Sequence, residues 1–267
     1  MAFDFHSDKD RYFKMQLDNA EQYVLPFIQR HEFLDASMRI LEIGCAEGGV
    51  LKAFLKMGCK GVGIELMESR LELAKIYLEE FLRTGSVELL CKNIYDVDVE
   101  KEFKYKFDLI ILKDVIEHIP DQDKFLRTLR KFLNYNGKIF LGFPPWYMPF
   151  GGHQQICKSK IMSRMPYVHL LPGFIYKIIL KIFGESDSII KEMMDVKYTG
   201  IGIERFEYLC NKNHYHIALR EFYLINPIYK YKFNLTPKVQ IKLISYIPFL
   251  RNFFTTCAYY LIEKKEA

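Results

Sequence analysis

An acidic residue followed by three glycines is the part of this sequence best suited to chemistry. Glu42 stands near the end of the apolar run Arg39–Ile43, and Gly44, Gly48 and Gly49 follow it closely. Glycine has no Cβ atom, so a ligand can approach the backbone at such a turn. The negative charge of Glu42 repels a dinucleotide pyrophosphate and attracts a ligand that carries an ammonium or sulfonium group. We therefore expect a positively charged, nucleotide-like ligand at this turn.

Polar residues also stand at the ends of three further apolar runs. Glu65 follows one run, and an acid at that place can accept hydrogen bonds from both hydroxyls of a ribose. Lys113 and Asp114 follow a second run, although Asp114 is equally suited to capping the next turn. Asn93 follows a third run, where a plain turn residue is the alternative interpretation. We expect Glu42 and Glu65 to share one site.

Two histidines are candidates for proton transfer, because imidazole can act as a base near neutral pH. His118 lies just beyond Asp114, where a structural role beside the ligand is at least as good an interpretation. His153 follows Gly151 and Gly152, and its alternative role is to organise a loop. We name His153 and His118 as candidate catalytic residues, with both alternatives open.

The elements that must position these residues alternate regularly between strand and helix. This alternation predicts an α/β fold with a doubly wound, seven-stranded and mostly parallel sheet. In such sheets the ligand lies at the carboxyl ends of the strands, near the switch point. The predicted strands are 39–43, 61–65, 87–91, 107–112, 138–143, 216–225 and 253–263, and the predicted helices are 50–57, 68–83, 121–132 and 204–213.

Changes in this pattern divide the chain into four predicted segments. Residues 1–38 form an N-terminal helical cap, and residues 39–143 form the ligand-binding α/β core. Residues 144–203 are too long and too aromatic for a plain loop, so we expect a helical lid over the substrate. Residues 204–267 complete the sheet and carry an insert at 226–252.

Five motifs in order resemble the class I S-adenosylmethionine-dependent methyltransferase family, of the kind that acts on small molecules. They are the glycine turn at 42–49, the strand and acid at 61–65, Asn93-Ile94, the segment 107–120 with its Asp-Val-Ile-Glu-His-Ile run, and the Asn136-Gly137 turn. The resemblance covers residues 39–143 well and 204–263 loosely. Any one motif alone is weak, whereas five in order are strong.

The resemblance implies a Rossmann-like methyltransferase fold, with S-adenosylmethionine as cofactor and S-adenosylhomocysteine as product. It also implies a set of cofactor-binding residues along the motifs. These are Tyr12, Glu42, Gly44, Cys45, Ala46, Gly48, Glu65, Leu66, Asn93, Ile94, Lys113, Asp114 and His118. Arg11 and Tyr12 are expected to fold over the cofactor, or else to serve helix packing.

The acceptor pocket is expected where the lid leaves the core. Aromatic residues gather there, and they can form a wall of the pocket, the core of the lid, or both. The candidate substrate-binding residues are Phe143, Trp146, Tyr147, Phe150, His153 and Tyr167.

An apolar stretch at 169–183 carries Lys177 and Lys181 four positions apart, which is typical of an amphipathic helix. Docking on the catalytic core is the first interpretation of this stretch. Contact with a membrane surface or a lipid-linked substrate is the second.

Composition also bears on the partners, the metal content and the location of the protein. The net charge of +5 is modest and spread along the chain, so we expect no nucleic-acid partner. The six cysteines form no Cys-x-x-Cys pair, so we expect reduced thiols and no metal site. Neither a signal peptide nor an apolar run long enough to span a bilayer is visible, so we expect a cytoplasmic protein. We also expect the protein to be a monomer or a homodimer.

The predicted reaction is methyl transfer to an oxygen or carbon of a small acceptor that is apolar or lipid-linked. No Asn-Pro-Pro-Tyr-type motif follows residues 107–112, which disfavours methylation of nucleobase or glutamine nitrogen. A nicotinamide-dependent oxidoreductase is one alternative, but Ala46 replaces the second glycine of the dinucleotide pattern. A catalytically silent module that binds S-adenosylmethionine is the other.

Overall fold

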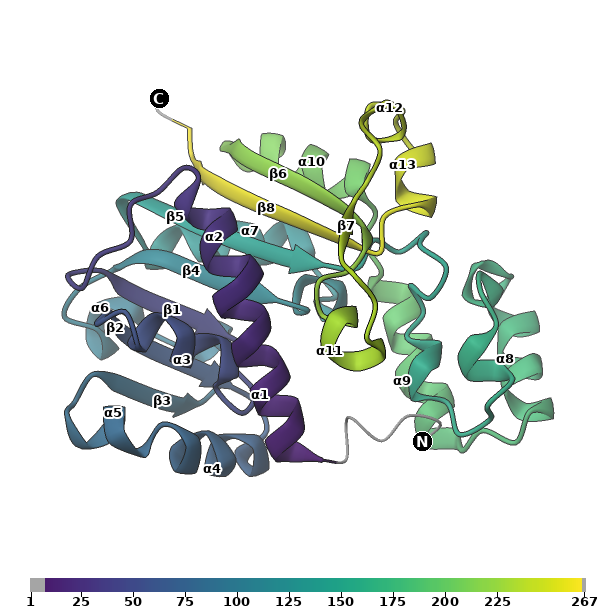
Figure 1. Ribbon diagram of the computed structural model, residues 1–267, viewed down its shortest axis with the longest axis horizontal. Helices are drawn as coiled ribbons and strands as arrows, with labels where there is room; N and C mark the ends of the chain where they lie inside the picture. Colours follow the sequence, from purple (N-terminus) through teal and green to yellow (C-terminus); the bar gives the residue numbers. More distant parts are fainter. Residues whose placement is uncertain (1–7, 266–267) are drawn as a thin grey trace.

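Buried apolar runs form the strands at the centre of the fold. The computed structural model describes residues 8–265, and its sheet has helices on both faces (Figure 1). Strand β4 is buried along nearly its whole length, as expected for a parallel strand covered on both sides. The strands are β1 (Arg39–Ile43), β2 (Lys60–Glu65), β3 (Val87–Cys91), β4 (Phe107–Lys113), β5 (Leu133–Phe143), β6 (Tyr215–Ile225), β7 (Lys238–Val239) and β8 (Cys257–Lys264).

Helices on the two faces of the sheet bury two separate hydrophobic clusters. One cluster contains Phe125 and Phe206, and the other contains Val24 and Phe54. The α-helices of the core and N-terminus are α1 (Lys9–Asn19), α2 (Leu25–Gln29), α3 (Gly49–Leu55), α4 (Glu68–Tyr77), α5 (Glu79–Arg83), α6 (Val99–Glu102), α7 (Gln122–Phe132) and α10 (Ile203–Lys212). A π-helical turn, Ala20–Val24, joins α1 to α2.

The strand order is β3-β2-β1-β4-β5-β8-β6-β7. Strands β1 to β5 pair in parallel, and β8 runs antiparallel between β5 and β6. The order reverses between β1 and β4, so this pair marks the switch point where doubly wound sheets bind ligands. The predicted fold class is thus confirmed.

The strand count and three boundaries differ from the prediction. The sheet has eight strands among the described residues, because the short β7 pairs with the edge of β6. The last strand begins at Cys257, since Leu250–Phe253 form a helical turn. Strand β5 begins at Leu133, and a register shift against β4 replaces the turn expected at Asn136 and Gly137. The helix predicted over 68–83 breaks after Tyr77, whose carbonyl accepts a hydrogen bond from the Lys52 Nζ.

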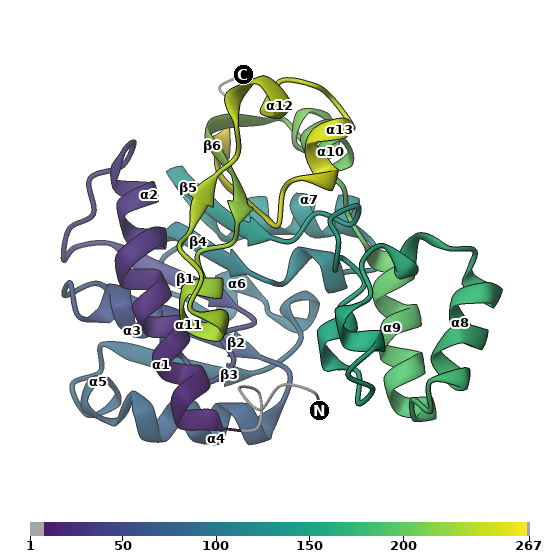
Figure 2. The same cartoon turned by 45° about the vertical axis from the view of Figure 1, so that its right-hand side comes forward.

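Residues 144–203, which we call the lid, pack around a hydrophobic cluster of their own. Figures 1 and 2 place α8 (Gly173–Ile182) at the outer edge of the molecule, with α9 (Asp187–Thr199) between it and the core. Three short 3₁₀ turns precede these helices, at Gln154–Ile156, Met162–Arg164 and Val168–Leu170.

The second insert, residues 226–252, returns to the other side of the same opening. Its first helix, α11 (Tyr229–Phe233), lies beside α1 in both ribbon views, and Ile228 packs on Met15 (Figure 2). The short helices α12 (Lys242–Ser245) and α13 (Leu250–Phe253) follow. The opening at the carboxyl ends of β1 and β4 therefore lies between the lid, α1 and α11.

His169 holds the start of the lid together. It is fully buried, and its Nε2 donates to the Trp146 carbonyl at 2.8 Å while its Nδ1 accepts from the Gln154 amide at 2.8 Å. The Lys197 Nζ donates to the His169 carbonyl at 2.6 Å. Both ring nitrogens thus have partners only in the neutral Nε2–H form. The helix predicted from His169 begins instead at Gly173, because His169 belongs to this network.

Acid is expected to destabilise the protein through His169. Burial lowers the pKa of His169 from 6.5 to about 4, so the unfolded chain takes up the proton first as pH falls. Stability present above pH 6.5 should be lost between pH 6.5 and 4, by at most about 3 kcal/mol for this group. Urea unfolding across that pH range measures the loss. His169→Gln should make the profile less steep, with the remaining slope due to the other histidines that have a lowered pKa, and an equally steep profile in that variant would contradict the assignment.

Candidate active site

The turn after β1 is tied to the end of β2. The Ile64 carbonyl accepts from the Gly44 N–H at 2.7 Å and from the Cys45 N–H at 3.1 Å. Gly44, Ala46 and Gly48 all have positive φ angles, of which that of Ala46 is 50°. A positive φ strains a residue that has a Cβ atom, and such strain is common at ligand sites. The backbone here is therefore held in one specific shape.

Glu65 holds this turn with both carboxylate oxygens. Its Oε2 accepts from the Ala46 N–H at 2.9 Å, and its Oε1 accepts from the N–H groups of Leu66 and Met67 at 2.9 and 3.0 Å. Each carboxylate oxygen has lone pairs to spare after these bonds. Glu65 thus anchors the glycine turn and remains able to accept from a ligand hydroxyl.

Glu42 is buried with one oxygen, Oε2, that has no hydrogen-bond partner among residues 8–265. Burial raises the pKa of Glu42 well above its ordinary value, although Lys113 opposes the shift. A buried polar atom without a partner is costly unless a ligand satisfies it. Glu42 lines a hollow beside Gly44, Cys45 and Ala46, so a bound donor group there would reach it.

Lys113 and Asp114 form an ion pair at the end of β4, with 2.7 Å between Nζ and Oδ2. Burial opposes the charge on Lys113, but Asp114 outweighs it and raises the pKa of Lys113 to about 12. Asp114 has a φ of 56°, and its N–H donates to the Gly142 carbonyl at 2.7 Å. Its side chain is therefore committed to Lys113 and does not cap the next turn.

The glycines of the turn face protein as well as the hollow. A Cβ atom on Gly49 would lie 2.7 Å from the Phe13 carbonyl oxygen, so α1 crosses α3 at this point. A Cβ atom on Gly48 would lie 2.8 Å from Leu78. These two glycines allow close packing of α1 and α4 onto the turn, a role that the sequence did not reveal.

A cavity of about 770 Å³ adjoins the hollow beside Glu42. Tyr12, Arg70 and Asp114 line both spaces. The walls of the cavity come from α1, the segment after β4, the lid and the second insert. Its walls include Tyr12, Met67, Arg70, Glu117, His118, Met148, Phe150, His153, Gln155, Asn226, Tyr229 and Lys232.

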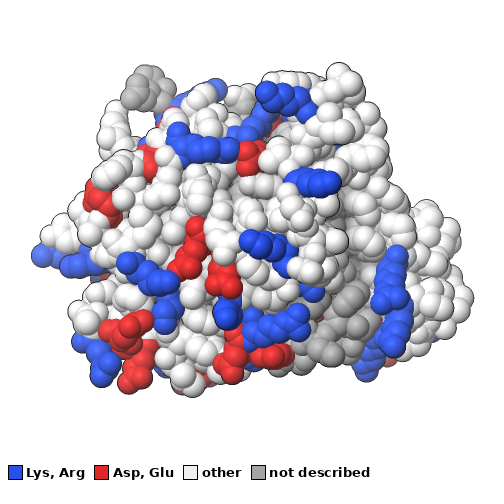
Figure 3. All heavy atoms as spheres, viewed as in Figure 1, with Lys and Arg blue, Asp and Glu red and all other residues white. Residues whose placement is uncertain are grey.

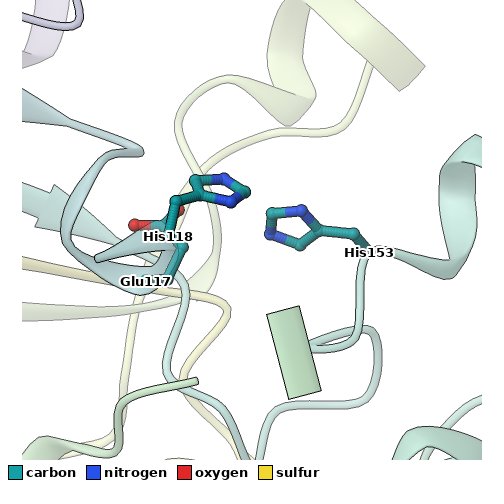
Figure 4. A group of neighbouring side chains, drawn as sticks. All are labelled: Glu117, His118 and His153. Atoms are coloured by element: carbon teal, nitrogen blue, oxygen red, sulfur yellow. The ribbon is translucent and has the colours of Figure 1, made fainter. Parts of the chain in front are cut away.

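His118 and His153 face one another across this cavity (Figure 4). Their ring centroids are 5.0 Å apart, and the ring planes are inclined by 67°. Desolvation lowers the pKa of His153 from 6.5 to about 3, and His118 adds to the shift. Desolvation also lowers the pKa of His118. Both rings are neutral at neutral pH, which is the form that a base or a metal ligand requires.

Glu117, next to His118, was not singled out as a site residue by the sequence. Its side chain is buried, and neither carboxylate oxygen has a hydrogen-bond partner in the described part of the chain. Burial raises its pKa well above the ordinary value, and the charge of Asp114 adds to this. Glu117, His118 and His153 bring their donor atoms within 4.8 Å of one another, although composition had led us to expect no metal site.

Four of the six candidate substrate residues lie away from the walls of this cavity. Phe143 is fully buried in the core, where its ring stacks on Tyr260. Trp146 packs edge-on against His169 within the lid. Tyr147 and Tyr167 are partly exposed and pack on Phe253. Phe150 and His153 line the cavity.

Several candidate cofactor residues lie outside the two spaces as well. Leu66 is 67% exposed, and Asn93 caps the 3₁₀ turn Ile94–Asp96 by accepting from the Tyr95 N–H at 3.1 Å. Ile94 is buried in the core cluster. Arg11 is exposed on α1, whereas Tyr12 reaches both spaces.

Tyr229 and Lys232 are site residues that sequence reasoning missed. Desolvation lowers the pKa of Lys232 to about 8, and Asp114 opposes this shift. Both residues come from the second insert, more than 110 positions after Asp114. The Tyr- and Lys-rich composition of the insert was visible, but nothing local indicated that it turns back onto α1.

Comparisons with known proteins agree with this geometry. A family model described as a methyltransferase domain matches residues 16–146. A ubiquinone biosynthesis O-methyltransferase of Nitrobacter winogradskyi is 29% identical over 104 residues, which are 39% of this chain and 38% of that protein. The protein of the same name from Chromobacterium violaceum is 26% identical over 133 residues, or 50% and 55% of the two chains. The match thus spans about half or less of these relatives.

Solved structures share the whole fold at low identity. An S-adenosylmethionine-dependent methyltransferase from Clostridium acetobutylicum has a TM-score of 0.54 and 12% identity, over 98% of this chain and 96% of that one. A phosphoethanolamine N-methyltransferase of Haemonchus contortus, in complex with S-adenosylhomocysteine, has a TM-score of 0.54 and 14% identity over 91% and 52%. These likenesses establish the fold. The family match over residues 16–146 identifies the α/β core as a methyltransferase domain.

Proposed function

We propose that this chain transfers a methyl group from S-adenosylmethionine to a hydroxyl oxygen of a small, partly apolar acceptor. The observation that carries the proposal is the junction of two spaces. The hollow beside Glu42 meets the cavity that holds His118 and His153, and Tyr12, Arg70 and Asp114 line both. The hollow beside Glu42 suits the methyl donor, and the cavity that holds His118 and His153 suits the methyl acceptor.

The residues on the donor side fit the cofactor of the family. Glu42 offers a buried carboxylate oxygen without a partner to a cationic group. Glu65 stands at the end of β2, the strand next to β1, where it can accept from ribose hydroxyls. Tyr12, the turn 44–48 and Lys113–Asp114 complete the proposed binding set. When bound, the cofactor supplies a methyl group made electrophilic by a sulfonium.

An oxygen acceptor is favoured over a carbon acceptor by two observations. Neutral imidazoles at His118 and His153 can take up a hydroxyl proton. The curated relatives are O-methyltransferases by name. The protein's main task is alignment, because two groups held within about 3–3.5 Å react far faster than free molecules. The lid and α11 supply this alignment and exclude water.

Mass spectrometry tests the proposal directly. The protein is incubated with S-adenosylmethionine that carries a deuterated methyl group and with a panel of hydroxylated aromatic acceptors. Transfer of the labelled methyl to a hydroxyl is expected, and it should fall sharply in His153→Ala. Failure with every acceptor, together with tight cofactor binding, would favour the silent module. A thermal shift with NAD but none with S-adenosylhomocysteine would favour the oxidoreductase.

We also propose that the lid contacts an anionic membrane surface or a lipid-linked acceptor through α8. Phe174, Ile178 and Ile182 form an exposed stripe at a spacing of four, with exposed fractions of 70%, 54% and 75%. Lys177 and Lys181 lie beside them. Residues 144–184 contain five Lys or Arg and no Asp or Glu. In Figure 3 the lid side is blue and white, while the red atoms gather over the core.

This surface is that of an interfacial helix, which lies on a membrane rather than crossing it. No helix within residues 8–265 has the length and apolar character needed to cross a bilayer. Tyr176 and Leu180 face the interior of the lid, so the exposed stripe is not required for lid packing.

Binding to anionic vesicles is expected for the unaltered chain, and it should be weak with zwitterionic vesicles. Replacing Phe174, Ile178 and Ile182 together with serine should reduce the bound fraction at least tenfold, because burial of three apolar side chains is lost. Vesicle sedimentation measures this fraction. Tyr198→Ser on α9, which removes another exposed apolar group, is the matched control. Equal binding of the triple variant would contradict the proposal.

A further inference from the structure

We propose that Glu117, His118 and His153 form a binding site for one divalent metal ion of the zinc class. The inference rests on the proposed methyl transfer only for its catalytic role, since the site itself follows from geometry. Three independent observations carry it: the donor cluster, the unsatisfied carboxylate and the constrained position of His153.

The donor cluster joins two parts of the chain. Glu117 and His118 lie in the 3₁₀ turn Ile116–His118 that follows β4, and His153 lies at the start of the lid (Figure 4). Each offers a ligand atom, and these atoms lie within 4.8 Å of one another. Two ligands of one zinc ion stand at most about 4 Å apart, because each bond is about 2.0–2.2 Å long. Small rotations of the three side chains, with the backbone unchanged, would bring the ligand atoms to this separation.

The Glu117 carboxyl is the second observation. It is 2% exposed, and neither oxygen meets a hydrogen-bond donor of the described residues. Its backbone is fixed, because the Thr199 hydroxyl donates to the Glu117 carbonyl at 2.6 Å. Burial of an unsatisfied carboxyl is unfavourable, and a bound cation removes that cost. The nearby Asp114 is paired with Lys113, so Glu117 is the acid that a cation would satisfy.

The backbone of His153 is the third observation. His153 has a φ of 59°, a conformation that costs free energy for a residue with a Cβ atom. The two glycines before it are tightly enclosed: a Cβ atom on Gly152 would lie 2.3 Å from the His169 Cβ. The network around His169 thus fixes the turn that presents the His153 ring to His118.

The donor types select the class of metal. Two imidazole nitrogens and one carboxylate suit zinc and its neighbours, such as cobalt, nickel and iron(II). Magnesium and calcium prefer oxygen donors alone. Three protein ligands leave a coordination position open, which is the arrangement of catalytic zinc sites. Because all three residues line the cavity, an open position on the metal would be reachable from the space proposed for the acceptor.

At that position the metal would act on the acceptor hydroxyl. Coordination would make the hydroxyl more acidic, and its proton would pass to solvent, to which His118 is exposed. The oxygen electron pair forms the new bond to the methyl carbon. The electron pair of the broken carbon–sulfur bond stays on sulfur, so charge and atoms balance. In the metal-bound protein the imidazoles would serve as ligands, whereas in the metal-free protein they stay available to take up the hydroxyl proton, as in the proposed function.

Metal titration tests the site without reference to activity. Full-length protein, treated with a chelator and dialysed, is titrated with Zn²⁺ by calorimetry and with Co²⁺ by visible absorption. One ion per chain is expected. Glu117→Gln and His153→Ala should each weaken binding at least tenfold, because each removes one of three ligands. Zn²⁺ should raise the Tm of the unaltered chain and leave that of Glu117→Gln unchanged.

Two controls separate this site from adventitious binding. His216→Ala removes an exposed histidine on β6, and Cys91→Ser removes the exposed thiol. Both variants should bind Zn²⁺ as the unaltered chain does. Stoichiometric binding that survives in Glu117→Gln and His153→Ala, or that disappears in Cys91→Ser, would overturn the site. Absence of binding would overturn it too, while labelled methyl transfer by the metal-free protein would leave the proposed function standing.

Discussion

Replacing Glu65 with alanine is expected to weaken binding of S-adenosylhomocysteine by at least about 100-fold. The proposed role of this carboxylate is to accept hydrogen bonds from two ribose hydroxyls. A hydrogen bond to a charged group contributes about 1.5–3 kcal/mol, so loss of two removes most of the affinity. Isothermal titration calorimetry measures the change. Unchanged affinity in Glu65→Ala would remove Glu65 from the binding set.

The structure adds a second consequence of the same substitution. Glu65 also accepts hydrogen bonds from the N–H groups of Ala46, Leu66 and Met67. In Glu65→Ala these three backbone N–H groups lose their acceptor and must bond to water instead. Glu65→Gln keeps one acceptor oxygen for the turn and removes the charge. Its NH2 group would face the Ala46 N–H, so that bond is lost; we expect a smaller fall in unfolding temperature than in Glu65→Ala and still at least tenfold weaker binding. Glu79→Ala, an exposed acid on α5, is the control that should change neither property.

The core of the fold could be predicted because its signals are local. Strand β1 occupies the predicted residues, since an apolar run that ends in glycines has only one good placement. The helix break and the register shift that the sequence did not predict involve contacts between residues far apart in the chain. At the end of α4, the Tyr77 carbonyl accepts a hydrogen bond from Lys52, a residue 25 positions away. The register shift in β5 depends on how β4 pairs with it.

The site shows the same division between local and distant causes. Glu42, Gly44, Lys113 and Asp114 gather at one hollow, as expected from the ends of adjacent parallel strands. The acceptor side was harder to predict, because at least four segments that are far apart in the sequence form its walls. In the sequence, nothing distinguishes an aromatic residue of the core, such as Phe143, from one that lines a cavity.

Glu117 shows what a motif alone cannot reveal. The sequence drew attention to His118 and left its neighbour unassigned. Only the structure shows that Glu117 is buried without a hydrogen-bond donor. Burial and hydrogen-bond partners are properties of the packed chain, so a buried acid looks like any other acid in a sequence.

Replacing Gly49 with alanine is expected to destabilise the protein by about 1–3 kcal/mol or more, even without ligand. The new Cβ atom would lie 2.7 Å from the Phe13 carbonyl oxygen and 2.9 Å from the Gln16 Cβ, both on α1. Overpacking against backbone forces a helix to move and has a cost of this size. Because α1 carries Tyr12, its displacement should also weaken cofactor binding. Urea unfolding of the ligand-free protein measures the first effect.

Gly173→Ala is the matched control, because Gly173 also opens a helix but has room for a side chain. Its nearest neighbour would be the Met194 Cε at 3.4 Å, an ordinary contact. This variant should be neutral or slightly more stable, since alanine lowers the entropy of the unfolded chain. The two explanations of Gly49 then separate. Close packing of α1 predicts a loss of stability in the ligand-free protein. Direct contact of the cofactor with bare backbone predicts a loss of affinity with unchanged unfolding, and that result would return Gly49 to the role first expected from its sequence.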